Sequence, residues 1–449
     1  MLIELPLRFA PHIGWRALFY LRSQWWSPAR MSRYEDTRLR RLIRHAAEHV
    51  PYYRRLFREI GLDPEAFRGR VDLPRIPPLD KETVRQHVDE LVADNAAAFH
   101  PVWAQTSGST GTPLRLLLDA DCRINDAAAT LRAYLWAGYF PGMKVLTMRS
   151  FLRDISLNMG GRSLNASTVK LSRATAPRYW QAINRLKPST FHGYPFSLIV
   201  LAQLARDAGI GYHSPKRIIS FGESLPASLR RRLSEIYNGA LIFDFYAMTE
   251  NATLITECRC GTKHVLDDYA CHEFVDDRGQ PVESGTGEIL GTSYYNYAMP
   301  LLRYRTRDFA RLPDAPRPCG CGRRSRSVAF IEGRKDDYIQ TPDGQFINLT
   351  EEPMNAAVGV AASQFVQDRT NHMYVNILPG TDFDPASLAN VERELRLRVG
   401  NAIGISFKVV SELERRPGET GKIPFLISRI GSSVYASPGG ESTASRQAP

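Results

Sequence analysis

The chain has 449 residues, of which 43% are hydrophobic and 23% are charged. That length exceeds one ordinary domain and suits a large domain with a smaller one. Charged residues are interspersed, and no repeat or low-complexity stretch dominates the chain, which excludes a largely disordered protein and a repeat array.

Positive charge is in excess, with 58 Lys and Arg against 47 Asp and Glu and a net charge of +11. Such an excess can attract nucleic acid, anionic lipid or a polyanionic substrate such as a nucleotide, and it also occurs on ordinary solvated surfaces. Because no zinc-finger, recognition-helix or ribonucleoprotein pattern accompanies the charge, we expect no nucleic-acid partner.

No run of the chain reaches the roughly 20 apolar residues that cross a bilayer. The first residues lack the pattern of a secretory signal, so we expect a cytoplasmic protein. Residues 14–29 combine aromatic residues with Arg at helical spacing, which fits a helix in a membrane interface or one packed on the domain. The segment is short and has few cations, which favours packing on the domain over peripheral membrane contact.

The N-terminal part is predicted to be mostly helical, because apolar residues between residues 38 and 57 recur at helical spacing until Pro51. Further along, short apolar runs alternate with helical patterns. The runs span residues 144–148, 217–221 and 241–245, and a helical pattern spans residues 227–237. This alternation is typical of parallel strands with crossover helices.

The most informative segment is a loop rich in glycine and hydroxyl side chains. It consists of Thr106, Ser107, Gly108, Ser109, Thr110, Gly111 and Thr112 and is followed by Pro113. Glycine permits positive φ, so several N–H groups can surround an anion while the hydroxyls donate to phosphate oxygens. No Gly-Lys-Ser/Thr closes the loop, which excludes a Walker A motif. The composition fits a phosphate-binding loop and also a flexible surface loop.

The chain changes character near Gly333, where a shorter unit with strand-like stretches begins. One helical pattern there places four apolar residues on one face, namely Leu388, Val391, Leu395 and Val399. We expect an α/β fold with a large multi-layer N-terminal domain over residues 1–333 and a smaller, mobile α+β domain over residues 334–430. Residues 431–449, rich in Ser, Gly, Pro and Ala, are expected to form a disordered tail.

Ordered segments between residues 38 and 425 resemble those of the adenylate-forming, acyl-CoA synthetase-like superfamily. Besides the loop, they are residues 49–53 with 77–81, and residues 191–195, 222–225, 245–250, 303–308, 333–337 and 421–424. They look most like the branch of the phenylacetate-CoA ligases, coenzyme-adenylylating synthetases and capsular polysaccharide-cluster proteins. The order of these segments is more specific than any one of them.

The resemblance implies a nucleotide site for ATP or AMP. Besides the loop, its expected residues are Gly222, Glu223 and Ser224 along adenine, Phe245 and Tyr246 for stacking on adenine, and Asp308 and Arg334 near ribose and phosphate. An ionised carboxylate such as Asp308 accepts hydrogen bonds from both ribose hydroxyls well.

The same resemblance implies catalytic roles. Thr249 would meet the α-phosphate, and Glu250 would hold magnesium against the phosphate oxygens. Lys422 stands where the superfamily has its adenylation lysine, whose ammonium would stabilise the transition-state charge. Asp336 would be the hinge of the smaller domain. Ala247 replaces the family's usual glycine and can narrow the approach to the acyl carboxylate.

By resemblance, His192, Gly193 and Tyr194 border the acyl pocket, although a Gly-Pro turn after a strand explains the same residues without a function. Tyr134 is a further candidate for substrate binding. Its aromatic surface, with that of Trp136, suggests an aryl acid, whereas aromatic residues at helical spacing also form ordinary cores.

Cysteine and histidine residues form two short clusters with metal-ligand chemistry. They are Cys258, Cys260 and His264 in one cluster and Cys319 and Cys321 in the other, with Cys271 and His272 as spare candidates. Such a set holds tetrahedral zinc when two loops converge, although Cys-x-Cys spacing also fits ordinary reduced cysteines. Members of the resembled branch carry Cys and His at these places, which favours a structural zinc.

The expected function is ATP-dependent activation of a carboxylic acid as acyl-AMP, with release of pyrophosphate and transfer of the acyl group to an acceptor. The resemblance favours CoA as the acceptor, with an amine or hydroxyl as the alternative. Two other classes remain open: a nucleotide-binding protein without turnover, and a nucleotidyl transferase acting on a hydroxyl. The sequence gives no indication of the oligomeric state.

Overall fold

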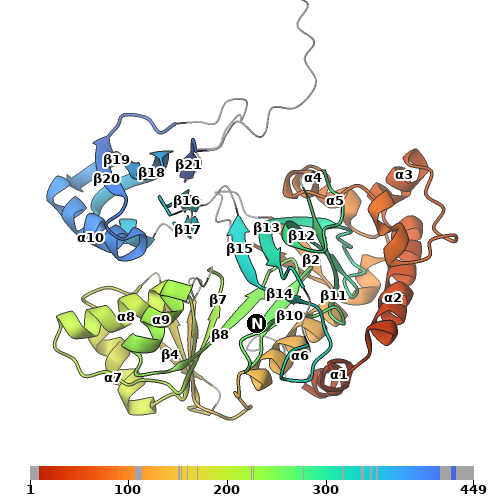
Figure 1. Ribbon diagram of the computed structural model, residues 1–449, viewed down its shortest axis with the longest axis horizontal. Helices are drawn as coiled ribbons and strands as arrows, with labels where there is room; N and C mark the ends of the chain where they lie inside the picture. The colour runs from red at the N-terminus through yellow and green to blue at the C-terminus, as the bar shows by residue number, and fades with distance from the viewer. Residues whose placement is uncertain are drawn as a thin grey trace, which may run out of the picture. The chain divides into compact units, whose positions relative to one another are not determined.

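The computed structural model describes residues 10–106, 114–149, 152, 154–158, 160–168, 170–223, 225, 227–276, 278–315, 318–334, 338–343, 346–349, 352–414 and 426–430. The chain divides into two compact units, Met1–Lys335 and Asp336–Pro449 (Figure 1). The division expected after residue 333 lies near this boundary. The tail expected over residues 431–449 lies outside the described residues.

Helices come first in the larger unit. They are α1 (Ala10–Ser23), α2 (Pro28–His49), α3 (Pro51–Glu59), α4 (Lys81–Gln86) and α5 (Val88–Leu91), with 3₁₀ helices at Arg70–Arg75 and Ala96–Phe99. The predicted apolar face of α2 is fully buried through Leu39, Leu42 and Ile43. Pro51 ends the helical pattern of α2 and occupies the first turn of α3, where its missing N–H costs nothing.

Residues 14–29 do not form one helix throughout, as had been expected. α1 ends before Ser27, whose side chain caps α2 by accepting a hydrogen bond from a backbone N–H in the first turn. Tyr20 is fully buried, as expected for packing on the domain, whereas Trp15 and Trp25 are 75% and 51% exposed. Only part of the aromatic surface of this segment is therefore used for packing.

A nine-stranded sheet follows, in the order β14-β10-β9-β8-β7-β6-β3-β5-β4. Its strands are β3 (Val145–Arg149), β4 (Ser156–Asn158), β5 (Ser163–Ser167), β6 (Thr190–Gly193), β7 (Arg217–Phe221), β8 (Leu241–Ala247), β9 (Leu254–Glu257), β10 (Lys263–Val265) and β14 (Ser327–Val328). Strands β5, β3, β6, β7 and β8 are parallel neighbours. Their crossovers contain α7 (Ala176–Leu186), α8 (Pro195–Asp207) and α9 (Ala227–Ile236), so the predicted α/β fold is confirmed.

The two faces of this sheet bury different cores. Phe191, Ile218 and Ile242 pack with α7, α8 and α9 on one face. Ile219 and Phe243 pack with α1 and α6 (Ala120–Trp136) on the other. Successive residues of a strand point to opposite faces, which produces this separation. Figure 1 shows α7, α8 and α9 on one side of the strands and α6 on the other.

A four-stranded antiparallel sheet, in the order β11-β12-β13-β15, also belongs to the larger unit. Its strands are β11 (Ala270–Val275), β12 (Gly285–Ser293), β13 (Tyr304–Leu312) and β15 (Phe330–Arg334). A β-carbon at Gly291 would stand 2.2 Å from the Ala252 carbonyl oxygen. Glycine is therefore required where β12 passes the segment that follows β8.

A hairpin of β1 (Val102–Gln105) and β2 (Arg115–Leu118) flanks the predicted phosphate loop. The Thr106 N–H donates to the Leu114 carbonyl oxygen at 3.0 Å, and the Leu114 N–H donates to the Thr106 hydroxyl oxygen at 2.9 Å. These two bonds close the hairpin on either side of residues 107–113, which lie outside the described part of the chain.

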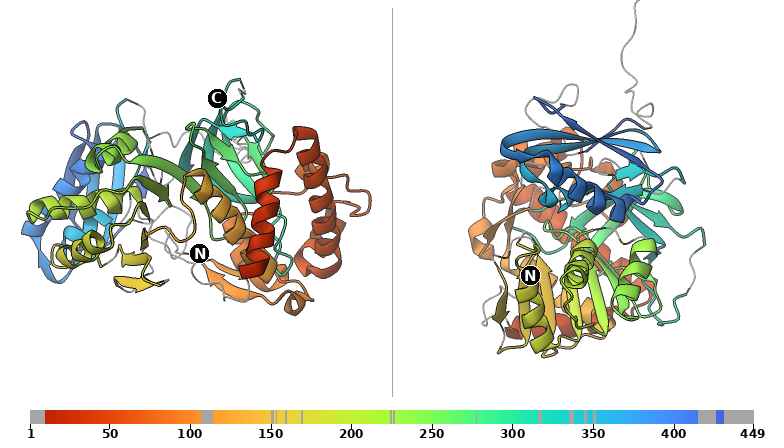
Figure 2. Two further views of the ribbon diagram at one scale, coloured as in Figure 1. Left: turned by 90° about the horizontal axis from the view of Figure 1, so that it is seen from below. Right: turned by 90° about the vertical axis from the view of Figure 1, so that its left-hand side faces the viewer.

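The smaller unit contains two sheets and a helix. Its elements are β16 (Tyr338–Gln340), β17 (Phe346–Asn348), β18 (Val358–Arg369), β19 (His372–Asp384), α10 (Leu388–Val399), β20 (Gly404–Val409) and β21 (Leu426–Ser428), with 3₁₀ helices at Glu352–Ala356 and Pro385–Ser387. The larger sheet has the order β20-β19-β18-β21. α10 buries Val391, Leu395 and Val399 against it, as its periodicity predicted. Figure 2 shows α10 lying along one face of this sheet. The α+β character expected for this unit is confirmed.

None of the helices in the described part of the chain combines the length and the apolar character needed to span a membrane.

Candidate functional site

A row of side chains lies across the carboxyl ends of four parallel strands. Arg149 ends β3, Phe221 ends β7, and Phe245 lies beside Phe221 in β8. His192 of β6 pairs with Thr147 and Ile219 and so points to the same face, the one that α6 covers. Open α/β sheets bind ligands at this edge.

His192 is the centre of this row. Its Nε2 and the hydroxyl of Tyr134, from α6, lie 2.6 Å apart, which is a short hydrogen bond. Its ring packs at a tilt of 34° against that of Phe221, with the centroids 4.3 Å apart. Burial, with a smaller effect from the positive charge of Arg149, holds the pKa of His192 well below its ordinary value. The imidazole is therefore neutral near pH 7 and acts as a hydrogen-bonding group.

Gly193, Tyr194 and Gly222 turn the chain around this row. The Tyr194 ring lies 4.9 Å from that of Phe221. Gly222 has φ +76°, and a β-carbon there would lie 2.6 Å from the Tyr194 ring. A β-carbon at Gly193 would lie 3.2 Å from that of Met148. Small residues are thus needed where the backbone passes these side chains, while the predicted Ser224 lies outside the described residues.

Of the residues expected to bind the nucleotide, Tyr246 and Asp308 meet on the other face near the end of β8, whereas Phe245 lies in the row with His192 and contacts Tyr134. The Tyr246 hydroxyl donates to Oδ2 of Asp308 at 2.7 Å, which joins β8 to β13. Asp308 also pairs in register with Arg334 of β15. The structure therefore brings together Tyr246, Asp308 and the backbone of Arg334, and their roles toward a nucleotide stay predictions.

Glu250 follows Thr249 in the turn after β8 and is buried. The Tyr304 hydroxyl donates to its Oε1 at 2.9 Å. This hydrogen bond fixes a buried carboxylate beside β13. Tyr304 was not an expected site residue although it lies in the matched segment 303–308, because its contact with Glu250 arises only through the fold. Asp336 and Lys422 lie outside the described residues, so their positions stay predictions.

Two loops bring four potential metal ligands together. The ligand atoms of Cys258, His264, Cys319 and Cys321 all lie within 4.8 Å of one another. The Cys258 and Cys319 sulfurs are 3.6 Å apart, and Nε2 of His264 is 3.4 Å from the Cys321 sulfur. Cys260, also an expected ligand, is exposed and lies outside this group of four, but its thiol interacts with Cys319 and Cys258. His264 lies in β10, whereas Cys260 lies in the turn before it.

The surroundings favour the ligand form of Cys319 and His264, whereas burial raises the pKa of the Cys258 thiol to about 12. Burial raises the pKa of Cys319, but hydrogen bonds with Thr262 and Cys321 outweigh it and lower the value to about 7. Burial, aided by the charge of Arg323, lowers the pKa of His264 to about 4. Nδ1 of His264 lies 2.9 Å from the Ser325 hydroxyl, which leaves Nε2 directed at Cys321. A partner on the second nitrogen is the usual arrangement of a metal-binding histidine.

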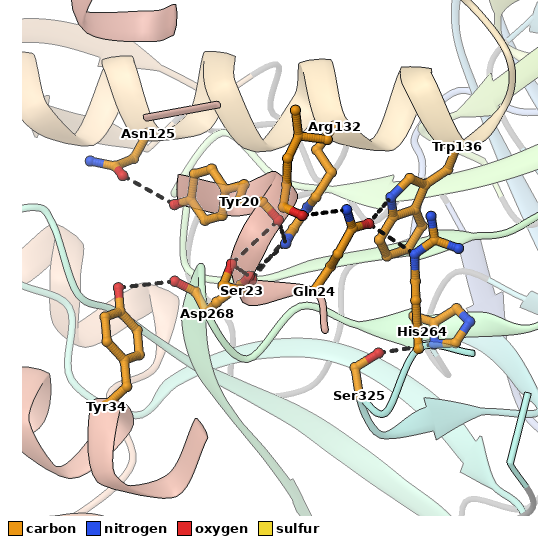
Figure 3. Close-up of polar contacts among 12 residues, drawn as sticks. Tyr20, Ser23, Gln24, Tyr34, Asn125, Arg132, Trp136, His264, Asp268 and Ser325 are labelled. Atoms are coloured by element: carbon orange, nitrogen blue, oxygen red, sulfur yellow. Dashed lines mark hydrogen bonds and ion pairs between the residues drawn. The ribbon is translucent and has the colours of Figure 1, made fainter. Parts of the chain in front are cut away.

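A buried ion pair stands beside this Cys/His cluster (Figure 3). Arg132 of α6 contacts both carboxylate oxygens of Asp268, at 2.5 and 2.9 Å, and the Ser23 hydroxyl donates to the same carboxylate. Arg132 also donates to the Tyr20 carbonyl oxygen at 3.1 Å. Trp136, one turn further along α6, lies edge-on to His264 with the ring centroids 5.5 Å apart. The end of α1, α6 and the cluster are therefore connected.

Comparisons with known proteins agree with this geometry. Residues 69–293 match the family model "AMP-binding enzyme", and residues 339–429 match "CapK C-terminal domain". A phenylacetate-coenzyme A ligase of Thermus thermophilus is 30% identical over 324 residues, which cover 68% of this chain and 70% of that protein. Protein CapK of Staphylococcus aureus is 23% identical over 376 residues, which cover 80% of this chain and 81% of CapK.

A solved structure shares the fold. The 2-hydroxyisobutyryl-CoA ligase in its postadenylation state superimposes with a TM-score of 0.63 and 20% identity, covering 91% of this chain and 92% of the ligase. This similarity concerns the fold alone. With the match to more than half of the chain and the 30% identical relative, the chain belongs to the AMP-binding enzyme family and is an adenylate-forming ligase of the branch that contains the phenylacetate-CoA ligases and CapK.

Proposed function

We propose that the protein uses ATP to convert a carboxylic acid into an acyl adenylate, releases pyrophosphate and transfers the acyl group to CoA. The observation that carries the proposal is that two separate groups of residues lie at the carboxyl edge of the nine-stranded sheet. Tyr246, Asp308 and Glu250 gather where β8 ends, while Tyr134 and His192 meet at β6 on the face covered by α6. One site can thus hold a nucleotide and an acid next to each other.

The nucleotide side would work as follows. Asp308 accepts a hydrogen bond from Tyr246, and its carboxylate is proposed to accept hydrogen bonds from the ribose hydroxyls. Glu250, oriented by Tyr304, can hold magnesium, which would neutralise charge on the phosphates during displacement of pyrophosphate. Thr249 is proposed at the α-phosphate. Lys422 is proposed as the cation that stabilises the transition state between carboxylate and phosphate.

The acyl side is assigned to Tyr134, His192, Gly193 and Tyr194. The His192 imidazole is neutral and held by Tyr134, so it orients an acyl group without competing for protons. Aromatic rings on both sides of His192 favour a flat acid. An amine or hydroxyl is the second candidate acceptor, because the smaller unit matches the CapK C-terminal model.

The Cys/His cluster is proposed as a structural zinc site. Three thiols and one imidazole within 4.8 Å match the donor number and chemistry of a closed tetrahedral site. The loops before β10 and before β14 would be joined by the metal. A closed set of protein ligands leaves no position for substrate, so the site would support the fold rather than the reaction.

Acid-dependent exchange of pyrophosphate into ATP tests the proposal. Exchange with a panel of carboxylic acids, followed by acyl-CoA formation with the best acid, is the expected result. Exchange without thioester formation would redirect the proposal to an amine or hydroxyl acceptor. Pyrophosphate exchange whose rate does not depend on the acid would contradict acid activation. Nucleotide binding without any exchange would contradict it too.

A further inference from the structure

One side of α1 exposes large apolar side chains to solvent. Trp15, Leu18 and Trp25 are 75%, 47% and 51% exposed. Trp15 and Leu18 lie one turn apart on α1, and Arg22 follows one turn later on the same side. The Trp25 N–H donates to the Arg22 carbonyl oxygen at 3.2 Å, so a helical turn continues past the end of α1 and keeps Trp25 near this side. We call these four residues the outer face of α1.

The opposite side of the same helix provides its packing. Ala17, Tyr20 and Ser23 are buried there, about half a turn away from the outer face. The Tyr20 hydroxyl donates to Oδ1 of Asn125 in α6 at 3.1 Å. The Ser23 hydroxyl donates to Asp268 (Figure 3). α1 therefore has apolar residues on two sides, whereas a surface helix usually has one apolar stripe, and a cluster of exposed large apolar side chains marks an interaction site.

Positive charge surrounds the outer face. Residues 10–34 contain four arginines and no Asp or Glu. Arg22 and Arg30 are exposed. Asp121, an acid of α6 beside α1, is paired with Arg16 at 3.2 Å, so its charge is balanced locally. A surface that combines exposed tryptophans with arginines is complementary to an anionic partner that also offers an apolar layer.

We propose that the outer face of α1 binds the surface of an anionic lipid bilayer, with its apolar side chains in the interface and its arginines at the head groups. Tryptophan favours the boundary between hydrocarbon and water, because its ring is apolar and its N–H is polar. Arginine is attracted to anionic head groups, and its apolar stem can lie along the interface. α1 has 14 residues, fewer than the roughly 20 that cross a bilayer, so it lies in the plane of the membrane. This binding is independent of the acid and the acceptor that the protein uses.

Co-sedimentation of the full-length protein with vesicles tests this binding. Phosphatidylcholine vesicles are compared with vesicles that also contain about 30% phosphatidylglycerol. The parental protein should bind the anionic vesicles, and high salt should weaken the binding because it screens the attraction. Trp15→Gln with Leu18→Gln should weaken binding at least about tenfold, since two apolar side chains no longer enter the interface. Leu157→Gln with Val409→Gln is the matched control, because these side chains are 57% and 58% exposed on β4 and β20.

A second pair of variants tests the charge. Arg22→Gln with Arg30→Gln should weaken binding to the anionic vesicles by about tenfold and leave the unfolding midpoint in urea unchanged. Arg206→Gln with Arg231→Gln removes two exposed arginines from α8 and α9, which cover the face of the nine-stranded sheet opposite α6. This control should bind like the parental protein.

Each other outcome overturns the proposal. It fails if the parental protein binds neither kind of vesicle, or if the variant with both Trp15→Gln and Leu18→Gln binds as well as its control. Equal binding to neutral and anionic vesicles contradicts the role of the arginines. A parental dimer that this variant does not form, without vesicle binding, assigns the outer face to a second copy of the chain. Binding of polyglutamate instead of vesicles assigns it to an acidic protein.

Discussion

The buried Arg132–Asp268 pair should be among the most sensitive points of the larger unit. Both side chains are almost inaccessible, with 1% and 2% exposed. Asp268→Asn preserves the shape but leaves the guanidinium without its counter-charge, and breaking a buried pair in this way costs about 3–5 kcal/mol. The Ser23 hydroxyl would lose its charged acceptor too, which loosens the end of α1.

Urea unfolding, followed by circular dichroism, measures this cost through the midpoint at constant m-value. Asp121→Asn is the matched control, since Asp121 pairs with Arg16 of α1 at 3.2 Å with 61% and 27% of the two side chains exposed. An exposed pair contributes at most about 1 kcal/mol. If the two variants lose similar stability, or if Asp268→Asn loses less than the control, the argument from burial is wrong.

Lys422→Ala should lower acid-dependent exchange at least about tenfold, equivalent to roughly 1.4 kcal/mol of barrier, with the fold intact. If the variant exchanges pyrophosphate at the parental rate, this lysine takes no part in the reaction. Glu250→Gln removes the charge that would hold magnesium, so half-maximal exchange should require more magnesium, and an unchanged magnesium dependence would contradict the role. The purified protein should contain about one zinc per chain, and Cys319→Ser should lose the metal and lower Tm, whereas Cys260→Ser should retain it. Equal zinc in both variants, measured by elemental analysis, would refute the ligand set. Burial, followed by the charge of Asp267, raises the Glu35 pKa from 4.5 to about 7. A raised folded-state pKa stabilises the protein at low pH, and this contribution is lost between about pH 4.5 and 7. Glu35→Gln should therefore gain stability relative to the parental protein between pH 5 and 8, and a constant difference in unfolding free energy would contradict the burial argument.

Periodicity predicted the elements that local sequence determines. The apolar runs at residues 217–221 and 241–245 correspond to β7 and β8, and the pattern at residues 388–399 is α10. Motif order singled out Tyr246 and Asp308 separately, whereas the hydrogen bond between them appears only in the structure. Such agreement is expected where hydrophobic alternation and turn residues indicate the same structure.

Other parts of the site depend on contacts between distant segments. Tyr134 meets His192 only because α6 packs across β6, and no spacing between them encodes that contact. The contact of His264 with Cys321 depends on the pairing of β10 with β9 and β14, which turns the imidazole toward that sulfur.

The two edge strands of the nine-stranded sheet are short, and this affects association between molecules. β14 contributes only two residues at one edge, and β4 contributes three at the other. Short edge strands give other chains little backbone with which to pair. As proposed, zinc bound by the Cys/His cluster would join the turns beside β10 and β14 and would hold β14 in its pairing with β10. Loss of the cluster would free the backbone groups of β10 for intermolecular strand pairing, and aggregation of the cysteine variants on warming would follow from that exposed edge.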